Sequence, residues 1–426
     1  MGQLSSQGQG RALVPWWRRY WPLVLGLIAV LVVVAADRAS KQRVGTDFHV
    51  FWQAGYDFAH GLPLYRPQPG ARGFIYPPFA AQVFQVLGVF QLKTAAWLFY
   101  VASVLLIFVA IVISEEIVQR LEVSRRGGRF PLVLALLLSA NFLFNNLNLL
   151  QVNLVIFVLC LLGARALAER REVAASGWIA AATAIKIVPI FFLVWAMIRG
   201  SRRTLAAVVG FGVLGVVLPM IQRGVSQGVV DLMAYYRSFL QAFAAGRVVT
   251  DYTNQSLAAM VYRAVAPTAP GAVSQYDYAY LGSLESAAPV LYPALALAIL
   301  ALFLIHLTRL RVLGQSVGPL EISSVFLVSH LLSAITWKAH LVTFLFVYYA
   351  FSSINLKSRS QRERVALLLA GAGAVVIGAG RDLIGTRLHH YVGGYSVIVW
   401  VMLLLFGLSV SLTQPPFNTK SSLPSQ

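Results

Sequence analysis

The sequence predicts an all-α polytopic membrane protein with about 11 to 13 transmembrane helices, because apolar runs close to the ~20 residues of one crossing recur along it. The chain has 426 residues, of which 58% are hydrophobic and only 12% are charged. A soluble domain carries about twice that share of charged residues. Each segment that crosses lipid must be helical, because lipid offers no partners for open backbone groups.

The apolar segments define a single transmembrane domain over residues 20–412, between a cytoplasmic N-terminal tail, 1–19, and a disordered C-terminal tail, 413–426. We expect 20–36 to be a retained first span, because no clear signal-peptide cleavage site follows it. The segments are 20–36, 76–92, 94–113, 130–145, 149–168, 173–198, 204–221, 288–308, 319–336, 340–356, 365–380 and 395–412.

Basic residues give the chain its formal net charge of +19 and indicate which loops face the cytoplasm. On a soluble protein this charge would suggest nucleic acid. Here the Arg clusters lie between apolar segments, as the positive-inside rule predicts, so no nucleic-acid partner is expected. Residues 37–75 and 222–287 are then outer loops, and 337–340 and 381–394 also lie outside. The aromatic-rich loop 37–75 predicts short interfacial helices.

Two regions do not fit a simple series of crossings. The basic loop 114–129 requires an odd number of crossings after residue 75, yet two apolar segments precede it. Either one of these segments does not cross fully, or the loop breaks the rule. Segment 173–198 is too short for two crossings, and Lys186 and Pro189 interrupt it. Two half-helices that meet near Lys186 would fit, since proline breaks the helical hydrogen-bond ladder.

Polar residues at the boundaries of these segments are candidates for chemistry. Asp47 follows the first span, where a carboxylate can act as a general base or cap the next helix. Tyr76-Pro77-Pro78 suits the first turn of a helix. It either only starts that helix or also shapes a site. Between Asn145 and Asn153 the chain gathers amides, of which Asn148, Gln151 and Asn153 can bind sugar hydroxyls or join helices.

Cationic side chains occur at two further places. Lys186 lies inside an apolar segment, where an ammonium must snorkel to water or find an anion, such as a phosphate or a structural carboxylate. Trp337-Lys338-Ala339-His340 joins two segments outside. Lys338 and His340 can bind an anionic headgroup, or the loop is an ordinary one with an interfacial Trp. Asn254 and Gln255 can add amide contacts from the second outer loop.

Other kinds of site are not indicated. The sequence has no Gly-rich phosphate loop and no metal-spaced His pair, and its one cysteine, Cys160, lies in an apolar segment. We therefore expect no intrachain disulfide, no metal and no cofactor requirement.

Together, these motifs resemble glycosyltransferase family 87, with matching order and spacing from about residue 20 to residue 412. The family usually has a glycine where Leu150 stands, and often a His pair where Lys338 precedes Ala339 and His340. The resemblance rests on Asp47-Phe48, Ala54-Gly55, Gly61, Leu64-Tyr65, Tyr76-Pro77-Pro78, Asn148, Gln151, Asn153, Ala184-Ile185-Lys186-Ile187-Val188-Pro189, Asn254-Gln255-Ser256 and Trp337 with His340.

The resemblance implies the C-type glycosyltransferase architecture and an enzyme similar to polyprenyl-phosphate-mannose-dependent α-mannosyltransferases. The 20–412 domain would move a hexose, with mannose as the first candidate, from a polyprenyl-phosphate sugar donor to a glycolipid or polysaccharide acceptor, with inversion. The lipid-linked sugar is then a substrate and not a cofactor. We expect a multi-pass protein of the bacterial cytoplasmic (inner) membrane, in contact with membrane lipid, whose active site faces outward.

The resemblance also implies a role for each candidate residue. Asp47 is the expected catalytic base, and Lys186, Lys338 and His340 are the expected ligands of the donor phosphate. The expected contacts to the sugar or acceptor are Tyr65, Tyr76, Asn148, Gln151, Asn153, Asn254, Gln255 and Trp337.

A transporter or flippase for a lipid-linked anionic substrate is the alternative, since it would also have broken helices and a buried lysine. The sequence shows no evident two-fold internal repeat. Its polar groups cluster on one side of the bilayer instead of at mid-depth. Both features favour the enzyme.

Overall fold

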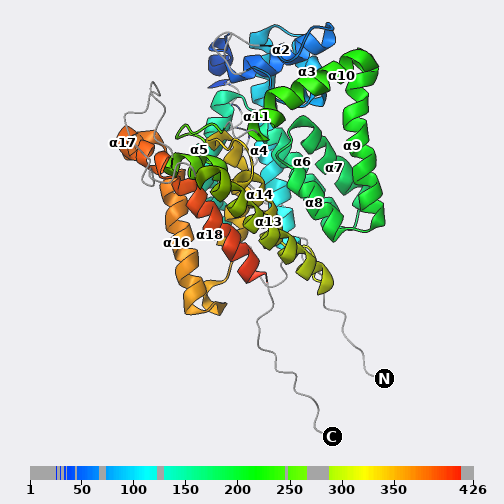
Figure 1. Ribbon diagram of the computed structural model, residues 1–426. Helices are drawn as coiled ribbons and strands as arrows, with labels where there is room; N and C mark the ends of the chain where they lie inside the picture. The colour runs from blue at the N-terminus through cyan, green and yellow to red at the C-terminus, as the bar shows by residue number, and fades with distance from the viewer. Residues whose placement is uncertain are drawn as a thin grey trace, which may run out of the picture.

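The computed structural model describes residues 36–43, 46–66, 73–121, 129–244, 248–265 and 287–413, with a few isolated positions between 25 and 34. Within these residues the chain forms helices and no strand. Long helices run from one end of the molecule to the other, and α2 (Asp47–Ala59), α3 (Pro78–Gly88) and α10 (Val225–Tyr235) lie across one end (Figure 1). The all-α polytopic fold class is confirmed.

The other helices follow in chain order, and the expected first span and both tails lie largely outside the described residues. They are α4 (Leu92–Leu121), α5 (Arg129–Leu149), α6 (Asn153–Ala168), α7 (Glu172–Ile185), α8 (Ile190–Arg199), α9 (Arg202–Arg223), the π-helix η1 (Tyr236–Leu240), α11 (Gln241–Ala244), α12 (Leu257–Val265), α13 (Ala288–Val312), α14 (Pro319–Leu331), the 3-10 helix η3 (Lys338–Thr343), α15 (Phe344–Ser352), the 3-10 helix η4 (Leu356–Ser358), α16 (Gln361–Gly378), α17 (Arg381–Gly394) and α18 (Val397–Leu412).

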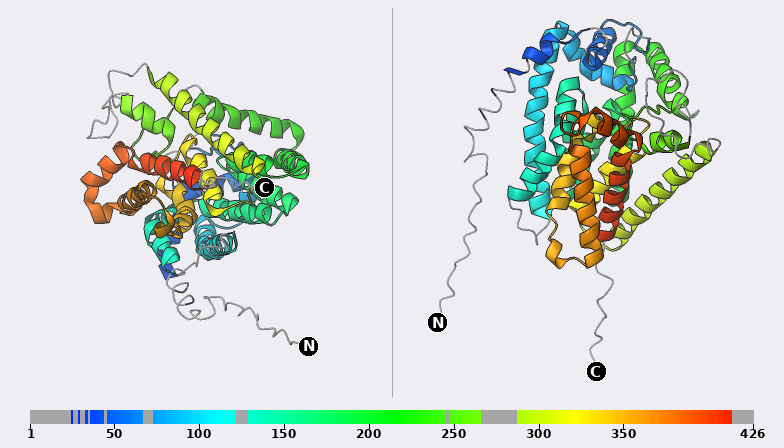
Figure 2. Two further views of the ribbon diagram at one scale, coloured as in Figure 1. Left: turned by 90° about the horizontal axis from the view of Figure 1, so that it is seen from below. Right: turned by 90° about the vertical axis from the view of Figure 1, so that its left-hand side faces the viewer.

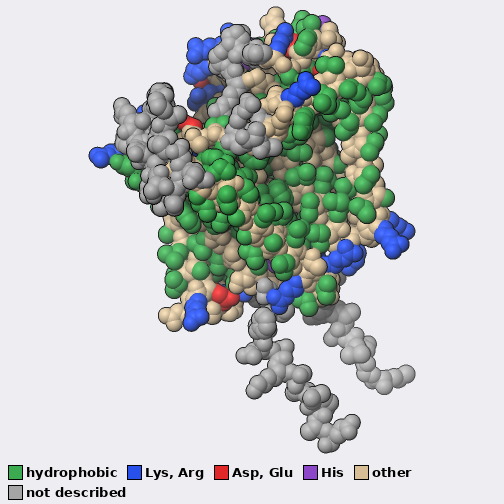
Figure 3. Space-filling model, viewed as in Figure 1, with side chains coloured by type: hydrophobic (Ala, Val, Ile, Leu, Met, Phe, Trp, Pro, Cys, Tyr) green, Lys and Arg blue, Asp and Glu red, His purple; other side chains and the backbone are tan. Residues whose placement is uncertain are grey.

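A broad hydrophobic band covers the middle of the molecule, with Lys and Arg side chains gathered above and below it (Figure 3). Large apolar side chains are exposed on the long helices, including Leu137 of α5, Val213 of α9, Leu297 of α13 and Leu368 of α16. A water-soluble protein rarely exposes so large a continuous apolar surface. The band is therefore the surface that faces lipid.

The predicted outer and inner segments separate toward opposite ends of the bundle. Helices α2, α3 and α10 lie at one end and α17 lies toward it, whereas the turn before α9 and the start of α16 lie at the other (Figures 1 and 2). Which of the two ends faces the cytoplasm stays a prediction from the basic clusters.

By length and composition, four described helices can each cross a membrane, namely α4, residues Phe130–Leu149 of α5, α9 and α13. The pair α16 and α17, bent by 105°, makes a fifth if it counts as one broken span. Shorter apolar helices lie among them: α6, α7, α8, α14 and α18. The expected total of about 11 to 13 crossings therefore stays a prediction.

The two apolar segments before the basic loop 114–129 differ in kind. Helix α3 has 11 residues, so it is about 16 Å long and cannot cross ~30 Å of hydrocarbon. Helix α4 has 30 residues and crosses easily. It continues to Leu121, so the prediction of a loop over 114–129 is wrong for residues 114–121, where the helical backbone hydrogen bonds persist. One crossing thus separates residue 75 from the basic loop, which is the odd number that the charge pattern requires.

Two breaks interrupt the helices of the bundle. The expected break at Lys186 is confirmed, because α7 ends at Ile185, Lys186 has an extended backbone, and α8 begins after Pro189. The predicted helix over 319–336 is wrong at its end, because α14 stops at Leu331. Beyond it, the Asn254 side chain accepts from the Thr336 N–H, and this bond replaces helical pairing.

Glycines allow α2 and α3 to pack backbone against backbone. A Cβ on Gly55 would overlap the Phe84 carbonyl, and one on Gly88 would lie 2.7 Å from the Tyr56 nitrogen. Only glycine permits so close an approach. The pair of helices is therefore fixed over the end of the bundle, with Asp47 in the first turn of α2.

Candidate active site

The α5–α6 turn positions the carboxylate of Asp47. Gln151, which is nearly inaccessible to solvent, donates from Nε2 to Oδ2 of Asp47 over 2.7 Å. Asn146, at the end of α5, donates from Nδ2 to the Gln151 carbonyl over 3.2 Å and so holds the turn. Asp47 is the first residue of α2 and Thr46 is its N-cap, so the carboxylate does not cap the helix.

Leu150, the residue before Gln151, has a φ of 50°. This left-handed backbone region disfavours side chains with a Cβ, and glycine adopts it without cost. The resemblance noted in the sequence leads us to expect glycine at this place, and this backbone conformation is one that suits glycine. Leu150 is fully buried, so its packing offsets the strain in this chain.

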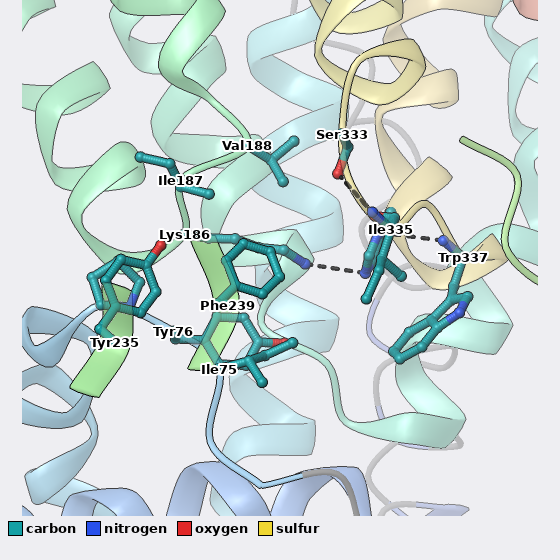
Figure 4. A pocket seen from close by; sticks show the side chains of 12 residues that line it. Ile75, Tyr76, Lys186, Ile187, Val188, Tyr235, Phe239, Ser333, Ile335 and Trp337 are labelled. Carbon is teal, nitrogen blue, oxygen red and sulfur yellow. Dashed lines mark hydrogen bonds between the residues drawn. The ribbon is translucent and has the colours of Figure 1, made fainter. Parts of the chain in front are cut away.

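Lys186 lies at the break between α7 and α8 and is only 8% exposed. Its Nζ donates to Oδ1 of Asn153 over 2.7 Å and lies 3.1 Å from Nε2 of His340. It also lies 5.6 Å from the ring centre of Tyr76. The side chain extends toward the segment that carries Ile335 and Trp337 (Figure 4). The Lys186 ammonium also interacts electrostatically with the Asp47 carboxylate.

One short turn therefore holds both charges, because Gln151 binds Asp47 and Asn153, two residues later, binds Lys186. Asn153 is fixed in turn, since its Nδ2 donates to the Ala339 carbonyl over 3.0 Å and to Oδ1 of Asn146 over 3.2 Å. A negative and a positive side chain from distant segments are thus held at a set separation.

Two adjoining cavities open at these residues, and Trp337 lines both of them. The first is narrow, and its lining includes Lys186, His340, Tyr76, Tyr235 and Phe239. The second has a volume of about 340 Å³, and its lining includes Asp47, Asn145, Thr253, Lys338 and His389. Small-molecule sites begin near this size, about 300 Å³.

The structure places the remaining sequence candidates in different surroundings. The expected phosphate ligands are divided, because Lys338 lines the cavity of Asp47 while Lys186 and His340 line the other. Asn148 is exposed and lines neither cavity. Tyr65 donates to the Tyr76 carbonyl over 2.6 Å, so it braces the wall behind the first cavity.

Asn254 and Gln255 bond mainly to backbone. Asn254 donates to the Val249 and Ala334 carbonyls, and Gln255 donates to the Tyr252 and Gly393 carbonyls. Both side chains are buried. They hold the segment around Tyr252 against the α17–α18 corner, and Gln255 also lines the second cavity.

Sequence reasoning missed several residues of the two cavities. Asn145 and Asn146 belong to the amide-rich stretch, but nothing in the pattern separates them from Asn148. His389 lies in a predicted outer segment that contains two consecutive histidines, and this was the available signal. Tyr252 and Thr253 directly precede the recognised Asn254-Gln255 pair.

The model of glycosyltransferase family 87 matches residues 74–336, which is more than half of the chain. The protein is therefore a membrane glycosyltransferase, and it belongs to glycosyltransferase family 87. No curated protein matches the chain. The matched range includes Tyr76, Gln151, Asn153 and Lys186, and it ends directly before Trp337. Asp47, Lys338 and His340 join the site through the geometry described above.

Family membership decides between the two hypotheses drawn from the sequence. A glycosyltransferase needs a sugar donor and an acceptor. The second cavity, at about 340 Å³, has the volume of a small-molecule site, whereas the first, at about 40 Å³, is a narrow cleft beside it. The transporter hypothesis is not needed to explain the broken helix at Lys186, because the break lines the candidate active site.

Proposed function

We propose that the enzyme transfers a hexose, with mannose as the first candidate, from a polyprenyl phosphate to a glycolipid or polysaccharide on the outer face of the bacterial cytoplasmic membrane. The observation that carries the proposal is the α5–α6 turn, which fixes a carboxylate and a buried ammonium through Gln151 and Asn153. Inverting transfer needs these two charges, one to accept a proton and one to receive a departing anion.

Asp47 is the proposed base. The acceptor hydroxyl attacks the anomeric carbon of the donor, and its proton passes to the Asp47 carboxylate. The carboxylate lines the larger cavity, where an acceptor hydroxyl can reach it. Gln151 occupies one carboxylate oxygen and leaves the other for the proton.

Lys186 and His340 are the proposed partners of the leaving group. As the bond between the anomeric carbon and the phosphate oxygen breaks, the electron pair moves to the polyprenyl phosphate. The negative charge grows on a phosphate oxygen, where a preorganised cation in a water-poor cavity stabilises it most. Tyr76 and Trp337 line this cavity and would contact the donor sugar or the start of its lipid chain.

The experiment is sugar transfer from labelled polyprenyl-phosphate hexoses to a cell-envelope lipid extract by the purified chain and its Asp47→Asn variant. Asn keeps an oxygen that can accept from Gln151, so the fold should persist. Loss of the base should lower kcat by about 10²- to 10⁴-fold.

Asp57→Asn is the matched control, because Asp57 lies on the same helix, is buried, and pairs with Arg66 at 2.7 Å without lining either cavity. It should lower thermal stability and leave kcat within about threefold, since it removes a structural charge and no reacting group. More than a tenth of normal turnover in Asp47→Asn would exclude Asp47 as the base. Absence of transfer by the wild-type chain from every labelled donor would contradict the donor class.

A further inference from the structure

The second cavity contains a lysine–histidine pair that the proposed donor site does not use. Lys338 lies 2.7 Å from Nε2 of His389, so η3 and α17 meet at this contact. An ammonium can only donate, and therefore Nε2 is the acceptor and His389 carries its proton on Nδ1. That Nδ1 is buried and has no hydrogen-bond partner in the part of the chain that the structure describes.

The pair is also without a carboxylate partner. No ion pair of Lys338 occurs among the described residues, although Asp47 lines the same cavity. Arg381 adds positive potential at His389. A buried donor without a partner is unfavourable, and a bound acceptor group would remove this cost. Lys338 and His389 thus bring one ammonium and an adjacent ring N–H without a partner to the lining of one cavity.

The position of the pair indicates which substrate carries the complementary group. Lys186 and His340 already give the donor phosphate a place in the first cavity, on the other side of Trp337. Lys338 and His389 share their cavity with Asp47, which must contact the accepting hydroxyl. A group bound by the pair is therefore close to that hydroxyl on the acceptor.

From this geometry we infer that Lys338 and His389 form an anion-binding subsite for an acidic acceptor sugar, one that carries a carboxylate or a phosphate near the hydroxyl that is glycosylated. The inference rests on the proposed function, since that function assigns the cavity of Asp47 to the acceptor. It goes further, because it selects acidic over neutral acceptors and gives Lys338 a different ligand from Lys186.

The test is direct binding of small soluble sugars to the full chain in detergent, without donor, by isothermal titration calorimetry. The probes are methyl mannoside, methyl mannoside 6-phosphate and methyl mannuronoside, which distinguish neutral, phosphorylated and carboxylated sugars. The wild-type chain should bind at least one acidic probe about tenfold more tightly than the neutral one, as charge-assisted hydrogen bonds allow. In Lys338→Gln and His389→Gln this preference should fall below about threefold, with neutral binding unchanged.

Lys93→Gln is the matched control, because Lys93 is an exposed lysine at the start of α4 and lines neither cavity. Equal wild-type affinity for all three probes would overturn the inference, and so would an equal loss of preference in the control. A raised KM for the lipid-linked donor in Lys338→Gln, with the preference for acidic sugars intact, would assign the pair to the donor phosphate instead. Because the readout is binding, it stays decisive even if Asp47→Asn retains turnover and the proposed base is wrong.

Discussion

Replacing Lys186 with Met should separate the activity of this enzyme from its stability. The substitution keeps an unbranched side chain of similar length and removes the ammonium. If Lys186 receives the charge of the departing phosphate, its loss should lower kcat by about 10²- to 10³-fold, as the loss of one preorganised donor does elsewhere. The KM for the donor should change less, because the interaction strengthens as the phosphate oxygen becomes charged.

Two opposing effects set the stability of Lys186→Met. Asn153 loses the donor at 2.7 Å from its Oδ1, and an unpaired buried acceptor costs about 1–3 kcal/mol. The wild-type chain also bears the cost of burying an ammonium that has no carboxylate within ion-pair distance among the described residues. That cost is several kcal/mol per ion. The variant should therefore unfold within about 1 kcal/mol of the wild type, or be more stable.

The assays are labelled-donor transfer for kcat and KM, and thermal unfolding in detergent for stability. Lys93→Met is the control for removal of a lysine charge, and both measurements should match the wild type because Lys93 is exposed. A Lys186→Met variant with more than a third of normal kcat would refute the leaving-group role. A variant that unfolds during purification would show that the lysine holds the broken helix together instead.

The remaining predictions concern the supports of the site. At Leu150, which has a φ of 50°, the Gly variant should be more stable than the Ala variant. At Leu154, which is equally buried and lies in α6, the Ala variant should instead be more stable than the Gly variant, by about 1 kcal/mol. If thermal unfolding gave the same order of stability at both positions, this account of Leu150 would be contradicted. Arg263 donates to the Asp251 and Gly394 carbonyls over 2.8 and 2.9 Å and so joins two walls of the second cavity. Arg263→Lys should raise the acceptor KM several-fold with kcat nearly unchanged, since lysine lacks the planar fork; an equal fall in kcat would indicate direct participation instead.

Composition and charge pattern predict the helices well, because a segment that crosses lipid must form its backbone hydrogen bonds within itself, as a helix does. The break at Lys186 and the start of α3 at Pro78 were both predictable, since proline restricts the backbone locally. The end of α14 at Leu331 was not predicted. The segment beyond it is held by the Thr336 hydroxyl, which donates to the His330 carbonyl, and by Asn254, which accepts from the Thr336 N–H from 82 residues away along the chain. No local pattern contains such a bond.

The residues of the candidate site were also predictable only in part. The sequence marks Asp47, Gln151, Asn153, Lys186 and His340 as polar residues at helix boundaries, but it does not show which of them touch. Asp47 and Gln151 are 104 residues apart, and Lys186 and His340 are 154 residues apart. The division of Lys338 from Lys186 depends on where Trp337 lies between two cavities, which is a property of packing alone.

The α5–α6 turn explains why this site tolerates a strained residue. Gln151 and Asn153 are separated by one residue, the buried Val152, so their amides point to Asp47 and Lys186 from a single rigid backbone segment. A helical Leu150 would continue α5 and carry Gln151 around the helix axis by about 100° per residue, away from Asp47. The left-handed residue is what ends α5 and redirects the chain. The distance between base and cation is therefore set by one backbone conformation, and its strain is offset by the packing of a fully buried leucine.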